Sequence, residues 1–209
     1  MTVSIDALEV GDPQIAWGDA GFTVDPDGTC RVGSVRIELV GRDRGSGIVG
    51  WSLRGLPAAL SGDVDGVPTA TSDRDLPAPA DHVNGVLAID HVVLLSPDLG
   101  RTVGALTAVG VDPRRERDGE LGGQQIRQIF YRFGATIVEV VGSPGAGGPG
   151  PSALWGITYV VEDIDRSAAF FGDHAAPVKP AVQPERRITT LRHRELGLSV
   201  RTALISARR

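Results

Sequence analysis

An internal repeat is the feature of this sequence that most constrains the fold. In the middle of the chain, a β-branched strand over 87–95 leads into a helix that starts with Ser96 as its N-cap. Three further strands are predicted over 111–117, 125–133 and 136–141, which gives the order β-α-β-β-β. Similarity at one period is stronger evidence than any single short motif.

The same order occurs again near the C-terminus and, in shortened form, near the N-terminus. The last copy has a strand over 157–161, a helix whose apolar face includes Ile164, Ala168 and Phe171, and strands over 178–182, 188–192 and 198–205. The first copy aligns Ile5-Asp6-Ala7 with Ile89-Asp90-His91 and residues 33–41 with residues 134–142. It is about eleven residues shorter, so we expect it to lack one strand, for which 48–56 is a candidate replacement.

Two stretches without hydrophobic periodicity separate the copies. Residues 57–84 are rich in Ala, Asp, Gly and Pro, and residues 142–152 are rich in Gly and Pro. We therefore predict an α+β fold of repeated units in this arrangement: a truncated N-terminal unit (1–56), a linker (57–84), and two complete βαβββ units (85–142 and 153–206).

Composition excludes several classes of function. With 41% hydrophobic and 22% charged residues the chain should fold, and its net charge of −5 gives no reason to bind nucleic acid or an anionic membrane. The longest uncharged stretch, 140–161, is interrupted by Gly and Pro and cannot cross a bilayer as a helix. The single cysteine, Cys30, excludes an intrachain disulfide and fits the cytoplasmic location that we expect.

The repeated unit resembles those of the vicinal oxygen chelate superfamily, which includes glyoxalases, bleomycin-resistance proteins and extradiol dioxygenases. The residues that carry the resemblance are Ile89-Asp90-His91-Val92-Val93, Ser96-Pro97-Asp98-Leu99 and the segment from Phe133 to Val141. The resemblance implies that two units pair into a cup of curled mixed sheets. It also implies a divalent metal in the cup, held by residues of the first and last strands of each unit.

Transferred to this chain, that ligand pattern is only half complete. The middle unit supplies His91 and Glu139, of which Glu139 is also the implied catalytic residue. The last unit offers Gly156 and Thr202 at the corresponding positions, and the first unit offers Ala7 and Glu38. The cofactor is therefore either absent or a divalent metal ion that binds an incomplete site.

Two arrangements could complete the metal site. A homodimer that paired the middle units across a twofold axis would bring together two copies of His91 and Glu139. Alternatively, His82 or His193 could move into the cup.

Further residues are candidates for contact with a ligand in the cup. They are Arg127, Gln128, Trp155, Arg187 and Thr202. We expect a protein that binds a small organic molecule in its cup, with a degenerate metal site. The alternatives are a metal-dependent enzyme of the glyoxalase, epimerase or dioxygenase type that uses His91 and Glu139, and an interaction module whose cup is filled by side chains.

Overall fold

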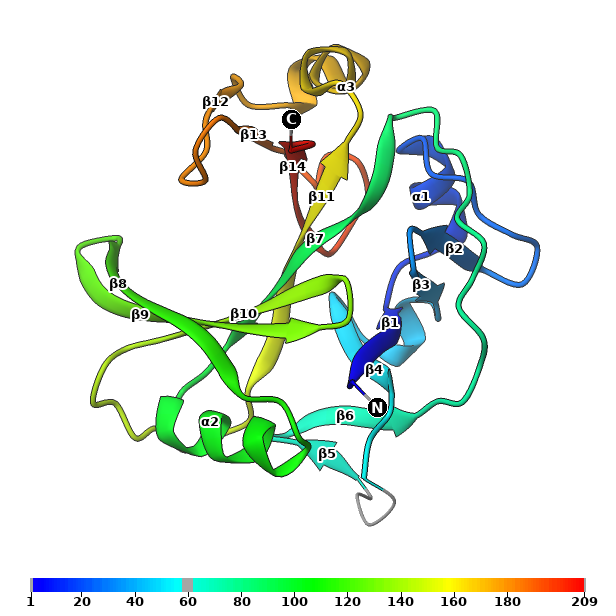
Figure 1. The fold of residues 1–209 in the computed structure, drawn as a ribbon. Coiled ribbons are helices and arrows are strands. Elements are labelled where there is room, and N and C mark those ends of the chain that lie inside the picture. The colour runs from blue at the N-terminus through cyan, green and yellow to red at the C-terminus, as the bar shows by residue number, and fades with distance from the viewer. Residues whose placement is uncertain (1, 58–61, 209) are drawn as a thin grey trace.

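The computed structural model describes residues 2–57 and 62–208, and it shows two curled β-sheets, each built from one half of the chain (Figure 1). The N-terminal half forms a six-stranded sheet in the order β2-β3-β1-β4-β6-β5. Its elements are β1 (Ser4–Val10), α1 (Gln14–Asp19), β2 (Thr29–Val32), β3 (Val35–Leu39), the 3-10 helix η1 (Arg42–Arg44), β4 (Ile48–Arg54), β5 (Asp63–Val64) and β6 (Val67–Thr71).

The C-terminal half forms an eight-stranded sheet in the order β12-β13-β14-β11-β7-β10-β9-β8. Its elements are β7 (Val86–Leu95), α2 (Leu99–Ala108), β8 (Pro113–Leu121), β9 (Gln124–Phe133), β10 (Thr136–Gly142), β11 (Ala153–Val161), α3 (Ile164–Phe171), the 3-10 helix η2 (Gly172–His174), β12 (Lys179–Pro180), β13 (Arg187–Thr190) and β14 (Arg201–Ser206). The sheet curls into a half-barrel, and the hairpins β8–β9 and β12–β13 extend to the same side of it (Figure 1).

Strand pairing shows that both sheets follow one plan. β1 is parallel to β3 and antiparallel to β4, just as β7 is parallel to β10 and antiparallel to β11. β4 is parallel to β6, as β11 is to β14. Each sheet therefore consists of two units joined through their first strands. The predicted α+β fold of repeated units on curled mixed sheets, with a truncated N-terminal unit, is confirmed.

The segment 57–84 contains regular structure that the sequence did not predict. β5 and β6 lie within it, pair with each other, and β6 pairs with β4, so they complete a fourth unit; the described residues between β4 and β5 (55–57 and 62) contain no helix. The expectation of a linker is therefore wrong for residues 63–71, while residues 58–61 lie outside the described part of the chain. β5 and β6 together have only seven residues, too few for a pattern of alternating polarity to stand out.

Two predicted boundaries also shift. Helix α2 is capped by the side chain of Asp98, which accepts a hydrogen bond from the Arg101 amide at 3.0 Å, rather than by Ser96. The strand expected over 178–182 is reduced to Lys179–Pro180, since a proline has no N–H to extend the ladder.

The two halves pack through aromatic side chains on the face of the large sheet that lies opposite to His91. Phe22 lies 5.4 Å from Tyr159, and Trp51 lies 5.5 Å from Phe133, measured between ring centroids. All four side chains are buried, so the concave face of the large sheet remains free for a site. Within the described residues, no helix combines the length and apolar character that a membrane crossing requires.

Candidate functional site

The strand register places His91 and Glu139 on the concave face of the large sheet. On β7 and β10 the side chains of Val92, Leu94 and Val138 are fully or almost fully buried, and His91 and Glu139 alternate with them. Glu139 is paired with Val93, two residues after His91, so both polar side chains point to the same side.

The pairing of β7 with β11 identifies the positions that correspond to His91 and Glu139 in the last unit. His91 lies opposite Thr158 and Val93 lies opposite Gly156 in this antiparallel pair. His91 stands as far before Asp98, the N-cap of α2, as Gly156 stands before Asp163, the N-cap of α3. Gly156 therefore corresponds to His91, as the sequence predicted.

The counterpart of Glu139 differs by one residue from the sequence prediction. Glu139 pairs with Val93, whose counterpart is Thr158, and Thr158 pairs with Ala203. The matching position is thus Ala203 rather than Thr202. Thr202 is buried, and its hydroxyl donates a hydrogen bond to the carbonyl of Val200 at 3.0 Å.

A backbone contact explains why Gly156 carries no side chain. A Cβ at this position would lie 3.0 Å from the carbonyl oxygen of Arg201 on the neighbouring strand. Gly50 occupies the same position in the small sheet, and a Cβ there would lie 3.2 Å from the carbonyl of Pro68. The close approach of two strands therefore favours glycine at the position of the second histidine in both sheets.

His91 is oriented by the residue that precedes it. The ladder between β7 and β11 is irregular between Ile89 and His91, so that Asp90 lies in a bulge. Asp90 contacts the Nδ1 atom of His91 at 2.8 Å and accepts a hydrogen bond from Arg186 at 2.5 Å. The Arg186 side chain is only 4% exposed and also donates to the carbonyl of Ser206. Asp90 therefore leaves the Nε2 atom of His91 directed at the concave face.

Glu139 completes a row of polar side chains across this face. One of its oxygens lies 3.6 Å from Nε2 of His91, and the other accepts a hydrogen bond from Gln128. Gln128 in turn accepts a hydrogen bond from Nε of Arg117 at 2.8 Å. The hydrogen-bond partner of Glu139 is thus the side-chain amide of Gln128.

The electrostatics of this row favour a charged Asp90. Burial opposes the charge, but the hydrogen bonds from His91 and Arg186 outweigh burial and lower the pKa of the Asp90 carboxyl. A charged Asp90 accepts a hydrogen bond from a proton on Nδ1 of His91 and so fixes the orientation of the ring. The arrangement can therefore hold or transfer a proton at Nε2 of His91, the atom that faces Glu139.

The residues present do not fit the four-ligand metal site that the resemblance implies. His91 and Glu139 carry donor atoms, whereas Gly156 and Ala203 carry none. Among the described residues, no group of three His, Cys, Asp or Glu side chains converges as a metal site would require.

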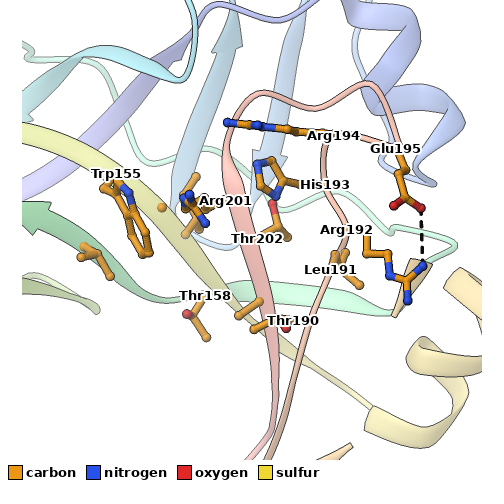
Figure 2. Close-up of a pocket in the computed structure, with 14 residues that line it drawn as sticks. Trp155, Thr158, Thr190, Leu191, Arg192, His193, Arg194, Glu195, Arg201 and Thr202 are labelled. Atoms are coloured by element: carbon orange, nitrogen blue, oxygen red, sulfur yellow. Dashed lines mark ion pairs between the residues drawn. The ribbon is translucent and has the colours of Figure 1, made fainter. Parts of the chain in front are cut away.

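Two neighbouring pockets open on the concave face. The first, which we call the floor pocket, has a volume of about 740 Å³ and lies between the floor of the sheet and the two hairpins; its residues include His91, Arg117, Gln128, Phe130, Glu139, Lys179 and Ile188. The second, which we call the loop pocket, has a volume of about 450 Å³ and lies under the segment that joins β13 to β14 (Figure 2). Trp155 and Thr202 line the loop pocket.

The structure brings together some of the predicted site residues and separates others. Gln128 lies with His91 and Glu139 in the floor pocket. Arg127 and Arg187 lie elsewhere: Arg127 pairs with Asp118 on the outer part of the β8–β9 hairpin, and Arg187 pairs with Asp165, each at 2.7 Å.

The two histidines that were alternative metal ligands, His82 and His193, also lie in different places. His82 is buried against the ring of Phe22 and accepts a hydrogen bond from the amide of Thr23, away from both pockets. His193 lies in the wall of the loop pocket, and burial lowers the pKa of its imidazole.

Sequence reasoning missed three residues that shape the site. Asp90 and Arg186 orient His91, and Arg201 stacks on Trp155. The shared Ile-Asp pair at Asp6 and Asp90 is a signal that could have indicated a structural role for Asp90, but a bulge cannot be recognised from the alternation of residues. The arginines are brought to the site by strand order alone.

Comparison with known proteins adds evidence on the fold. No family model matches the sequence, and no curated protein matches it. Solved structures do match along the whole chain. A variant of 4-hydroxymandelate synthase from Streptomyces coelicolor is 16% identical, with a TM-score of 0.68, over 100% of this chain and 94% of that one.

Two dioxygenases align over a similar extent. A catechol 2,3-dioxygenase is 12% identical with a TM-score of 0.61, over 100% of this chain and 93% of the other. The 2,2',3-trihydroxybiphenyl 1,2-dioxygenase of Sphingomonas wittichii is 12% identical with a TM-score of 0.59, over 99% of this chain and 91% of the other. The chain therefore has the vicinal oxygen chelate fold, as the repeated unit predicted.

Proposed function

We propose that this protein binds a small organic molecule on the concave face of its large sheet, next to a degenerate metal site. The observation that carries the proposal is the strand register, which puts Gly156 and Ala203 where two of four ligands would stand. The remaining pair, His91 and Glu139, is already engaged by Asp90 and Gln128.

The size and composition of the floor pocket support the binding of a small molecule. Its volume of about 740 Å³ lies in the range typical of ligand sites. It combines apolar surface from Phe130 and Ile188 with a few polar groups at the floor. The neighbours that share the fold over their whole length are named for reactions of small aromatic compounds, which is consistent with this use of the cup.

A thermal-shift screen with small organic acids, phenols and amines tests this proposal. A compound at ten times its Kd adds roughly 1.4 kcal/mol of stability, which corresponds to a rise of about 3–5 °C in Tm for a chain of this size. We expect at least one compound class to raise Tm in a concentration-dependent way, with the rise reduced in His91→Ala. The proposal is contradicted if every compound that raises Tm does so equally in wild type and in His91→Ala.

One observation favours a second candidate, a metal-dependent enzyme. Asp90 on Nδ1 of His91 is the outer partner that metal-binding histidines commonly have, and Nε2 lies 3.6 Å from Glu139. In this case the missing ligands would come from a second chain in a homodimer.

Metal analysis separates the two candidates. Protein purified without an affinity tag should be incubated with Ni, Zn, Mn or Fe(II), desalted and analysed for metal, alongside His91→Ala. Our first proposal predicts well below one metal per chain in both proteins. One metal per chain that is lost in His91→Ala would establish the second candidate instead.

A further inference from the structure

The loop pocket differs from the floor pocket in the chemistry of its surface. Its floor is apolar and includes Val93, Leu191 and Ala203. Its wall comes from the segment after β13, which carries Arg192, His193, Arg194 and Glu195 (Figure 2). An apolar floor with a charged wall is suited to an organic ligand that carries a charge at one end.

The charge of this wall is strongly positive. Three arginines line the pocket against one acid, Glu195, which lies 3.9 Å from Arg192. Arg194 and Arg201 make no ion pair or hydrogen bond with any other side chain that the structure describes. Two guanidinium groups are therefore free to meet an anion, and a guanidinium binds a carboxylate through two parallel hydrogen bonds.

A planar surface lies beside these charges. The guanidinium of Arg201 lies 4.6 Å from the ring centroid of Trp155, which is a cation–π contact. Trp155 is 41% exposed, whereas Trp17 and Trp51 are each 1% exposed. An exposed indole at the rim of a pocket offers a flat apolar surface on which a conjugated ring can stack.

We infer that the loop pocket binds a planar organic anion, such as an aromatic carboxylate, with its ring against Trp155 and its carboxylate at Arg201. This inference deepens the proposed function and rests on it, because the loop pocket and the floor pocket lie on the same face of the sheet. It specifies the chemical class of the ligand.

Binding of 2-naphthoate, compared with the neutral 2-naphthamide, tests the inference. Quenching of Trp155 fluorescence reports binding, because Trp17 and Trp51 are shielded, and equilibrium dialysis provides a second measurement. We expect 2-naphthoate to bind at least tenfold more tightly than 2-naphthamide. Equal affinity for the two compounds, or no measurable binding of 2-naphthoate, overturns the inference.

Variants locate the binding in the loop pocket. Arg201→Gln should lower the affinity for 2-naphthoate at least fivefold, and Trp155→Leu should lower it to a similar extent in dialysis. Arg44→Gln removes an exposed arginine of the N-terminal half and serves as the matched control. If both loop-pocket variants bind 2-naphthoate as tightly as the control does, the inference is wrong.

His91→Gln distinguishes the failure of this inference from the failure of the proposed function. A loss of 2-naphthoate binding in Arg201→Gln that exceeds any loss in His91→Gln supports the loop pocket as the subsite that holds the aromatic anion. If the thermal-shift screen instead yields compounds whose binding requires His91, while 2-naphthoate does not bind, the proposed function stands. In that case only the inferred class of ligand is overturned.

Discussion

The two sheets of this protein share one plan but treat an equivalent buried aspartate in different ways. Asp6 in the small sheet and Asp90 in the large sheet each lie in a bulge next to the position of the predicted first metal ligand. In the small sheet that position is Ala7, and in the large sheet it is His91. The aspartate is therefore a common structural element, and the histidine is what makes the large sheet suited to chemistry.

The partners of the two aspartates show the same contrast. Asp6 is fully buried and forms ion pairs with Arg36, Arg54 and Arg74. Arg74 comes from the segment after β6 and also pairs with Glu38 at 2.7 Å, so this segment covers the positions that correspond to the site. Asp90 has a single arginine, Arg186, and its other oxygen orients His91. The small sheet thus satisfies its carboxylates internally, while the large sheet leaves a ring nitrogen facing a pocket.

The largest expected effect is on stability, from Asp6→Asn. Removal of this charge leaves three guanidinium groups without their shared buried partner, so we expect a loss of about 3–5 kcal/mol in the free energy of unfolding. Asp90→Asn affects one arginine and should cost less, about 2–3 kcal/mol. Urea denaturation of both variants measures the difference, and a cost for Asp90→Asn equal to or above that for Asp6→Asn would contradict the comparison.

Acid unfolding provides a second way to test the role of Asp6. Burial opposes its charge, but the hydrogen bonds from Ser72 and Arg74 and the charges of Arg54 and Arg74 outweigh burial and lower its pKa. A carboxyl whose pKa is lower in the folded state stabilises the protein above its unfolded pKa of about 3.9, and this contribution is lost as the pH falls through the folded value.

We therefore expect wild type to lose stability between about pH 5 and pH 2, and Asp6→Asn to lose less over the same range. The slope should differ by up to about 1.4 kcal/mol per pH unit, the value for one proton. Urea denaturation at several pH values measures the slope. Parallel profiles for the two proteins would show that other carboxyls with a lowered pKa, such as Asp90, dominate acid unfolding.

An intermediate effect is expected from an attempt to restore the missing ligand. Ala203→Glu places a carboxylate at the position that corresponds to Glu139, so that three donors face the cup. We expect at least tenfold tighter binding of Zn²⁺ or Mn²⁺ than in wild type, measured by titration with a competing chelator. The matched control is Ala70→Glu, at the equivalent position of the small sheet, where Ala7 and Gly50 supply no donor. Equal gains in both variants would show that the added charge alone attracts the metal.

The repeat made the fold predictable because strands and helices of one length recur in one order. The resemblance of the repeated unit to those of the vicinal oxygen chelate superfamily pointed to His91, Glu139 and Gly156, since that family's ligands stand at set positions within a unit. The error of one residue at Thr202 has a physical cause: a twofold relation between strands is defined by pairing, and pairing is not visible in a single sequence. Similarly, β5 and β6 are stabilised by their contacts with β4 rather than by their own pattern.

Residues brought in from other strands were the least predictable part of the site. Arg186 and Asp90 are 96 positions apart in sequence and meet only because the strand order of the large sheet brings their elements together. Arg127, in contrast, is a predicted ligand contact, but alternation and the position of the hairpin direct it to Asp118.

The smallest expected effect is that of Arg127→Gln. Its ion pair with Asp118 is exposed, and such pairs contribute less than about 1 kcal/mol, so both stability and affinity for 2-naphthoate should remain close to wild type. An affinity change below twofold is expected in dialysis. A loss above fivefold would contradict the placement of Arg127 on the outer part of the β8–β9 hairpin, away from both pockets.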